Sequence, residues 1–264
     1  MSTFETWVVS ILLVAVLPAI AFIGSLIVRR AVGAEVLAAH NDVAGFIYAV
    51  IGVVYAVLLG FTAIIVWEQF RRAQEVVELE ANAIVDLYRN AAVFPADVRQ
   101  EIDTRLRDYA GLVVEDEWPK MSSGQTSPKT WDAYNQLWHT YHVFEPRNDH
   151  QQTWYQESIQ QLNELGDQRR ARLLNVRESV PTVMWVVLLG AGAVTIAFSF
   201  LFGTKNPRAQ GLMSAALTLT IGVVLLSILA LEHPYAGITR VSPEAFLQAQ
   251  QIMDAPLPWR TNAP

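Results

Sequence analysis

The sequence contains no cysteine, and only 17% of its residues are charged. The lack of cysteine excludes a disulfide framework, a thiolate metal site and a thiol nucleophile. Soluble domains carry about 25% charged residues, so one evenly mixed globular domain is excluded as well. Of the 44 acidic and basic residues, 32 lie between Glu68 and Glu178, and twelve are left for the other 153 residues. This distribution indicates membrane segments on either side of a polar insert.

Four uncharged stretches meet the requirement of about 20 residues for crossing a bilayer. They are residues 7–28, 43–67, 181–203 and 211–231. The connections within each pair are short, so the stretches are expected to form two hairpins, which places both termini and the insert on one side of the membrane. Pro18 lies inside the first stretch and is expected to kink it.

The insert is predicted to be helical. Residues 67–92 contain no proline or glycine, and their apolar positions recur at helical spacing, so the second span is expected to continue out of the membrane as one helix. A new helix is predicted from Pro95, with Ile102, Leu106 and Tyr109 on one face. We therefore predict an all-α membrane protein with four transmembrane helices as two hairpins and a helical extramembrane domain inserted between the second and third. The predicted boundaries are 1–67, 68–179, 180–232 and 233–264, the last being a tail with a short helix.

The orientation in the membrane is left open by the charges. Seven arginines near span ends on the insert side, against four basic residues in the two short loops, favour a cytoplasmic insert with cytoplasmic termini. Arg29 and Arg30, which follow the first span, favour the reverse. We expect an integral protein of a bacterial cell membrane, with the lipid bilayer as its first partner.

The second span carries a repeat of polar residues every seven positions. Seven residues advance a helix by nearly two full turns, so these side chains form one stripe. The stripe consists of Asn41, Tyr48, Tyr55, Thr62 and Gln69. Beside it lie small residues that let helices approach closely, namely Gly45, Ala49, Gly52, Ala56, Gly60 and Ala63. Two interpretations remain: Asn41, Tyr48, Tyr55 and Thr62 line a pore, or they form a dry packing seam.

Polar residues also flank both ends of the second span. His40, Asn41 and Asp42 precede it, where Asn41 and Asp42 suit a helix N-terminus and His40 would allow ion or proton sensing. Glu68 and Gln69 follow it, at the start of a mixed charge run that includes Glu80. That run is typical of a solvated helix face, although carboxylate rings in an oligomer would concentrate cations. The candidate pore-mouth residues are His40, Asp42, Glu68 and Gln69.

The sequence lacks the residues that several classes of function require. His139 and His142 have no third ligand at a matching spacing, and no phosphate-binding loop or nucleophile elbow occurs, so neither an enzyme, a metal site nor a cofactor is predicted. The insert has a net charge of 13 − 19 = −6, which argues against nucleic acid as a partner. The interiors of the four spans contain no ionisable residue, and ion-coupled transporters usually need one there.

Particular residues resemble the bestrophin-like domain family of membrane proteins. The resemblance is carried by residues 40–46, Tyr55, residues 67–70, Glu80-Ala81 and residues 87–89, and by later positions around Pro181, Phe202-Gly203, Pro234 and residues 241–243. The family's name implies a distant relation to bestrophins, which are pentameric anion channels with four spans and a pore lined by the second helix. The resemblance therefore implies a homo-oligomer, a pentamer, that passes inorganic ions.

Two functions from different classes follow. The first is an oligomeric bestrophin-like ion channel whose second span lines the pore. The alternative is a non-conducting membrane scaffold or sensor whose helical domain, about 110 residues long, binds a protein partner. Oligomeric state is the observation that separates them, because four helices are too few to enclose a pore alone.

Overall fold

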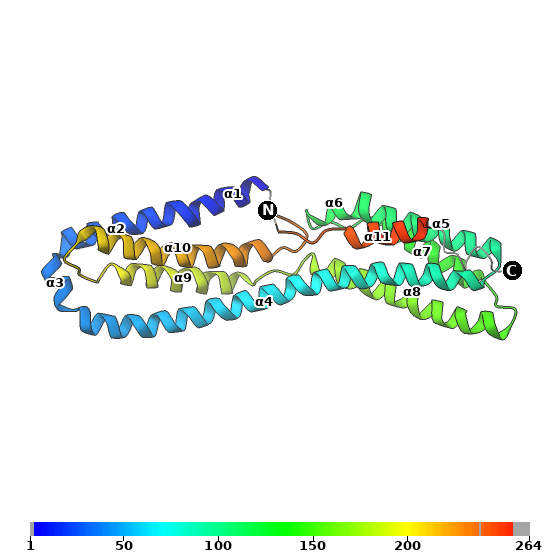
Figure 1. The fold of residues 1–264 in the computed structure, drawn as a ribbon, viewed down its shortest axis with the longest axis horizontal. Helices are drawn as coiled ribbons and strands as arrows, with labels where there is room; N and C mark the ends of the chain where they lie inside the picture. The colour runs from blue at the N-terminus through cyan, green and yellow to red at the C-terminus, as the bar shows by residue number, and fades with distance from the viewer. Residues whose placement is uncertain (1–2, 238, 256–264) are drawn as a thin grey trace. The chain divides into compact units, whose positions relative to one another are not determined.

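A computed structural model describes residues 3–237 and 239–255, and every regular element in this part of the chain is a helix (Figure 1). The chain divides into two compact units. Among the described residues, unit 1 holds the chain up to Gln69, Ser179–His233, Gly237 and Thr239. Unit 2 holds Phe70–Glu178, Pro234–Ala236 and the segment from Arg240 to Ala255. The helix α4 contributes to both units because it runs unbroken through the boundary at Gln69.

Unit 1 contains the four helices that are long and apolar enough to cross a membrane. Its elements are α1 (Thr3–Ile11), η1 (Leu12–Val16), α2 (Leu17–Val32), α3 (Ala34–Ala39), the first half of α4 (Asn41–Asn90), α9 (Thr182–Ser199) and α10 (Pro207–Leu231). α10 begins four residues before the predicted span. The Asn206 side chain causes this early start, because its oxygen accepts a hydrogen bond from the Arg208 N–H at 2.9 Å, and Pro207 then fits the first helical turn.

A π-helical turn in the first span accommodates Pro18, where the sequence predicted a kink. Leu12–Val16 forms this turn, and α2 starts at Leu17 without a break. Proline removes one helical hydrogen bond and clashes with the carbonyl four residues earlier, and a wider turn relieves both constraints. The turn also packs closely: a Cβ atom added to Gly222 of α10 would lie 2.5 Å from the Leu13 carbonyl oxygen.

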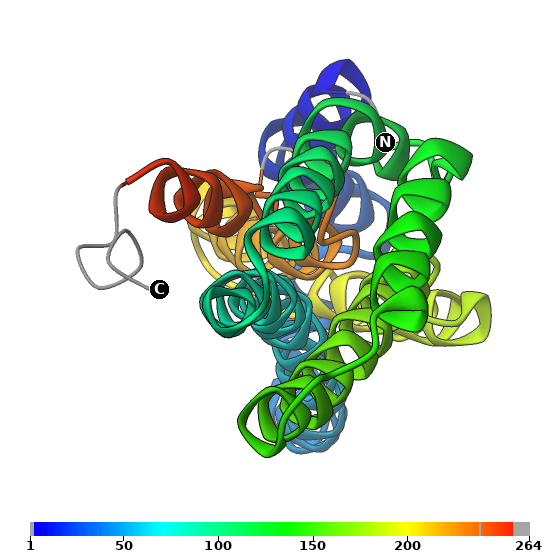
Figure 2. The ribbon, with the colours of Figure 1, turned by 90° about the vertical axis from the view of Figure 1, so that its right-hand side faces the viewer.

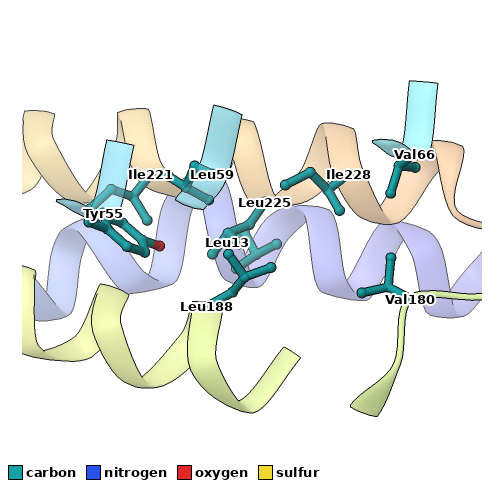
Figure 3. Close-up of a cluster of buried hydrophobic side chains, with 9 residues drawn as sticks. All are labelled: Leu13, Tyr55, Leu59, Val66, Val180, Leu188, Ile221, Leu225 and Ile228. Atoms are coloured by element: carbon teal, nitrogen blue, oxygen red, sulfur yellow. The ribbon is translucent and has the colours of Figure 1, made fainter. Parts of the chain in front are cut away.

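The core of unit 1 consists of hydrophobic side chains from α4, α9, α10, the π turn and the segment just before α9 (Figure 3). Its buried members are Leu13, Tyr55, Leu59, Val66, Val180, Leu188, Ile221, Leu225 and Ile228. α2 packs along α10, beside which α9 also lies. Much of the remaining apolar surface points outward, as expected for helices that lie in lipid or contact other copies.

Unit 2 is also helical. Its elements are the second half of α4, η2 (Ala91–Val93), α5 (Ala96–Leu112), η3 (Val113–Glu117), α6 (Trp118–Met121), α7 (Pro128–Val143), α8 (Asp149–Asn175) and α11 (Glu244–Asp254). α7 and α8 begin where Ser127 and Asn148 cap them, each accepting a backbone hydrogen bond from the residue three positions later. The C-terminal helix α11 packs against α5 (Figure 2).

The apolar face predicted from periodicity lies in the core of unit 2. Ile102, Leu106 and Tyr109 of α5 are fully buried, and so are Ile84 and Leu87 of α4. α5 starts immediately after Pro95, as the sequence predicted. A second π turn, η3, also ends two residues before a proline in an otherwise helical segment, as η1 does.

Candidate pore helix and a buried charged cluster

The polar stripe of α4 lies inside unit 1. Tyr55 and Thr62 are each 4% exposed, and the Thr62 hydroxyl donates to the Leu58 carbonyl at 2.8 Å. Tyr48 stacks on Phe198 with a ring-centroid distance of 5.8 Å. A side chain buried within one chain does not face a pore formed between copies of that chain. The arrangement therefore favours the packing interpretation over the pore interpretation for Tyr55 and Thr62.

Asn41 connects α4 to the loop after α9. Its Nδ2 donates to the Gly203 carbonyl at 2.8 Å, and its Oδ1 accepts from the Gly203 N–H at 3.0 Å. Both polar atoms of the amide are thus used within unit 1. The sequence suggested Asn41 as a helix cap or a pore residue, whereas in the structure its side chain joins two elements that are 162 residues apart.

The predicted pore-mouth residues are more accessible. Asp42 and Glu68 are exposed, Gln69 is half-buried, and the His40 ring nitrogen Nδ1 lies 2.7 Å from the Val36 carbonyl at the end of α3. Within residues 3–237 and 239–255, neither Asp42 nor Glu68 forms an ion pair. Their charge is therefore available at the two ends of the span, and their role at a pore mouth stays a prediction.

The predicted small-residue seam points largely outward. Ala49, Ala56 and Gly60 are exposed, and a Cβ atom added to Gly60 or Gly52 would meet nothing within 4 Å. The two other positions are in contact: Gly45 lies near Phe202, and Ala63 packs against the unit 1 core. Within a single chain the seam is thus mostly unused, and its role in packing stays a prediction that concerns other copies.

The centre of the outward face of α4 is apolar. Phe46, Val53, Val57 and Ile64, spaced at intervals of seven, four and seven, lie close to one line along the helix. Their exposed fractions are 77%, 64%, 49% and 56%. A face of this kind requires lipid, another protein surface or a dewetted pore to cover it.

Unit 2 contains a buried cluster of four charged side chains that the sequence analysis missed. Glu80 of α4, Glu117 of η3, and Arg169 and Arg172 of α8 are all at most 2% exposed. Arg172 forms two hydrogen bonds to Glu80 at 2.6 and 2.9 Å and one to Glu117 at 2.8 Å. Arg169 donates to the other oxygen of Glu117 at 2.6 Å. Two positive and two negative charges balance, which is what allows them to remain buried.

Residues around the cluster add further contacts, although the buried Arg169 Nε has no hydrogen-bond partner among the described residues. The Tyr109 hydroxyl donates to Glu80 at 2.6 Å, and the Ser127 N–H donates to Glu117 at 3.2 Å. The Arg172 guanidinium lies 5.7 Å from the ring centres of both Trp118 and Phe246, within cation–π range. The cluster therefore ties α4, α5, η3, α8 and the C-terminal helix α11 together.

The electrostatics of the cluster are dominated by burial and pairing. Burial raises the pKa of Tyr109 well above its ordinary value, and the nearby Glu80 carboxylate raises it further. Burial alone would lower the pKa of Arg172, but its attraction to Glu80 and Glu117 outweighs this, so the pKa lies well above its ordinary value. Arg172 is therefore a permanent cation, and Tyr109 a permanent hydrogen-bond donor near neutral pH.

The sequence did contain a signal for this cluster. The prediction that Glu80 lies on a solvated helix face is wrong, because Glu80 is fully buried. It lies on the same face of α4 as the buried Val76 and Ile84, which are four residues before and after it. Arg169 and Arg172 likewise continue the buried line of Leu162 and Leu165 in α8 at intervals of four and three. Charged residues at apolar-face positions of two helices are a recognisable sign of a buried ion pair.

One further carboxylate, Glu232 at the end of α10, is buried in unit 1. It is 6% exposed and accepts hydrogen bonds from the Val180 N–H at 3.0 Å and the Trp185 indole N–H at 3.1 Å. Glu232 thereby fixes the start of α9 against the end of α10. No pattern in the sequence distinguishes Glu232 from the other acidic residues of the C-terminal segment.

Sequence comparison assigns the family. The sequence profile of the bestrophin-like domain matches residues 15–246. The chain belongs to the bestrophin-like domain family. Comparison with curated proteins gives no match.

Solved structures with similar folds include bestrophin homologues. A single-substitution variant of a bacterial bestrophin homologue from Klebsiella pneumoniae superimposes with a TM-score of 0.68 at 14% identity, over 91% of this chain and 96% of that one. Another structure of a bacterial bestrophin homologue from the same organism gives a TM-score of 0.67 at 14% identity, over 89% and 94%. A structure described as a membrane protein gives 0.69 at 13% identity, over 91% and 96%. At such low identity the likeness shows the fold alone, and this bestrophin-like protein shares it along nearly its whole length.

Proposed function

We propose that this bestrophin-like protein is an oligomeric ion channel in which α4 borders the pore. Bestrophins are pentameric anion channels, and membership in the related family makes a ring of copies the natural assembly. The observation that carries the proposal is the division of α4 into two faces. The polar stripe with Tyr55 and Thr62 is buried within unit 1, whereas the face with Val53 and Val57 is exposed.

The outward face of α4 is the better candidate for the pore surface. A pore between copies is lined by side chains that each chain leaves exposed, which Val53, Val57 and Ile64 are. Apolar constrictions control ion passage by dewetting. The exposed carboxylates Asp42 and Glu68 at the two ends of the span would then set the charge at the mouths. The proposal thus moves the pore surface from the polar stripe to the opposite side of the same helix.

Tryptophans support the way the spans are placed in the membrane. Trp7 begins the first apolar stretch, Trp67 ends the second and Trp185 lies near the start of the third. Trp7 and Trp67 are 59% and 52% exposed. Tryptophan side chains concentrate at the boundary between lipid and water. Two hairpins would bring all three to the boundary on the side of unit 2, which we propose is the cytoplasmic side.

Ion flux into liposomes tests the proposal. Val53→Ser adds a hydroxyl at a position that would face the pore, so we expect a higher flux than in the wild type. Val186→Ser is the matched control, because Val186 of α9 is equally exposed at 64% and lies on a different span. The proposal fails if both variants conduct like the wild type, or if the purified protein is monomeric and shows no flux. The latter result would favour the scaffold or sensor alternative.

A further inference from the structure

Unit 1 contains a mostly apolar cavity of about 320 Å³ near the connection between α9 and α10. It is lined by Tyr48, Ser199, Phe202, Thr204, Gln210, Met213, Ser214 and Leu217. Its volume is at the lower end of the range of about 300–1,000 Å³ that small-molecule sites occupy. The lining belongs to predicted membrane spans and to the short connection between two of them, so the cavity is within reach of lipid.

One polar group in the lining lacks a partner. Gln210 is 2% exposed, and its Nε2 has no hydrogen-bond partner among the described residues. The orientation of this amide is fixed by Arg29, whose guanidinium donates to the Gln210 Oε1 at 2.9 Å. A guanidinium only donates, so the atom facing it must be the oxygen. The amide NH₂ group of Gln210 is therefore the group without a hydrogen-bond partner, and it requires an acceptor.

The charge around this end of unit 1 is positive. The two short connections, residues 29–42 and 204–210, contain four basic residues, Arg29, Arg30, Lys205 and Arg208, and two acidic ones, Glu35 and Asp42. Arg29 donates to the carbonyls of Thr204 and Lys205 as well as to Gln210, and within residues 3–237 and 239–255 no carboxylate pairs with it. A ligand with negative charge is favoured there.

We propose that this cavity binds one anionic membrane lipid per chain. Its acyl chain packs against Phe202, Met213 and Leu217, and an ester or phosphate oxygen accepts a hydrogen bond from the Gln210 Nε2. The acyl chain of such a lipid matches the apolar lining, its ester or phosphate oxygen supplies the missing acceptor, and its negative charge suits the positive surroundings. Water would satisfy the amide but would leave the apolar lining wet.

Native mass spectrometry of the delipidated, full-length protein tests this site. Phosphatidylglycerol and phosphatidylcholine with the same acyl chains serve as probes. The wild type is expected to retain one phosphatidylglycerol per chain and to bind it several-fold more tightly than phosphatidylcholine. Gln210→Glu still accepts from Arg29, but it loses the donor and adds a negative charge, so we expect about a tenfold or larger loss of phosphatidylglycerol affinity.

A pair of tryptophan substitutions on α10 provides the control. Leu217→Trp fills the cavity and is expected to abolish retention of the lipid. Leu219→Trp places the same side chain on the exposed surface of the same helix, outside the cavity, and is expected to bind as the wild type does. Equal retention by the wild type, Gln210→Glu and both tryptophan variants overturns the proposal. So does the absence of any retained lipid on the wild type, which would mean that the cavity holds water.

Discussion

Arg172 and Glu80 are 92 residues apart in the sequence, yet they form a bidentate pair with both side chains fully buried. Removing one member of a buried ion pair leaves the other charge uncompensated, which costs about 3–5 kcal/mol of stability. Arg172→Met is therefore expected to lower the free energy of unfolding of unit 2 by about that amount, measured by hydrogen exchange or denaturant titration of the full chain.

A neighbouring arginine provides the control for this prediction. Arg170 lies two residues earlier in α8, is largely exposed and pairs with Asp167 across one turn. Exposed pairs contribute at most about 1 kcal/mol, so Arg170→Met is expected to be nearly neutral. Equal effects of the two substitutions would show that the cluster does not stabilise unit 2.

Tyr109 is expected to make the stability of unit 2 sensitive to alkaline pH. Its pKa is raised well above the ordinary value of 10.0, first by burial and then by Glu80. The unfolded chain releases this proton first, so stability is fully present below pH 10 and is lost as the pH rises above it. Tyr109→Phe has no proton to release, and its unfolding free energy should fall less steeply between pH 9 and about pH 11. Identical slopes in the two proteins would contradict this.

Gly192 and Tyr55 form a close contact that a methyl group would disturb. A Cβ atom at position 192 would lie 2.6 Å from the Tyr55 hydroxyl oxygen, whereas at Gly190 it would meet nothing within 4 Å. Gly192→Ala is expected to destabilise the protein by about 1–3 kcal/mol through overpacking, and Gly190→Ala is not.

The same contact predicts a rescue. The Tyr55 hydroxyl, whose oxygen is drawn in red in Figure 3, is buried, and it has no hydrogen-bond partner among the described residues. Tyr55→Phe should therefore be neutral or stabilising by itself, and it should recover most of the loss in the Gly192→Ala background. Thermal unfolding of the four variants in detergent gives the double-mutant cycle. Additive effects without recovery would mean that the two residues do not meet.

Glu232 is expected to be required for the junction between α9 and α10. Glu232→Ala removes the acceptor of the Val180 N–H and the Trp185 indole N–H, and each buried donor left unsatisfied costs about 1–3 kcal/mol. Glu232→Gln keeps one acceptor oxygen and should retain more of the stability. The order wild type, then Gln, then Ala in melting temperature is the expected result, and a Gln variant as unstable as the Ala variant would argue against these hydrogen bonds.

Periodicity and composition predicted most of the fold, because helices and membrane spans are local properties of a sequence. The four apolar helices follow from uncharged stretches long enough to cross a bilayer, and the apolar faces of α4 and α5 follow from spacing. The site was harder to predict. A seven-residue repeat such as that of Tyr48, Tyr55 and Thr62 shows which side chains share a face, but not whether that face points into the chain or away from it.

Pairing between distant residues was also beyond the sequence. The link between Asn41 and Gly203 and the cluster around Arg172 join segments that are far apart, and nothing local to either partner identifies the other. What was recognisable is the misfit of Glu80 and Arg172 with the apolar lines on which they lie. A buried charge of this kind can be recognised from its position on an apolar helix face, whereas no such pattern marks Glu232.

The π turn before Pro18 resets the register of the first span. The buried positions of this span are Leu13, Pro18, Ala21 and Ser25, so the step across the turn is five residues and the later steps are three and four. Each residue rotates a helix by about 100°. A chain that lost one residue from Leu12–Val16 would keep its hydropathy and length for crossing the membrane, yet α1 would be rotated by about 100° and would present a different side to α10.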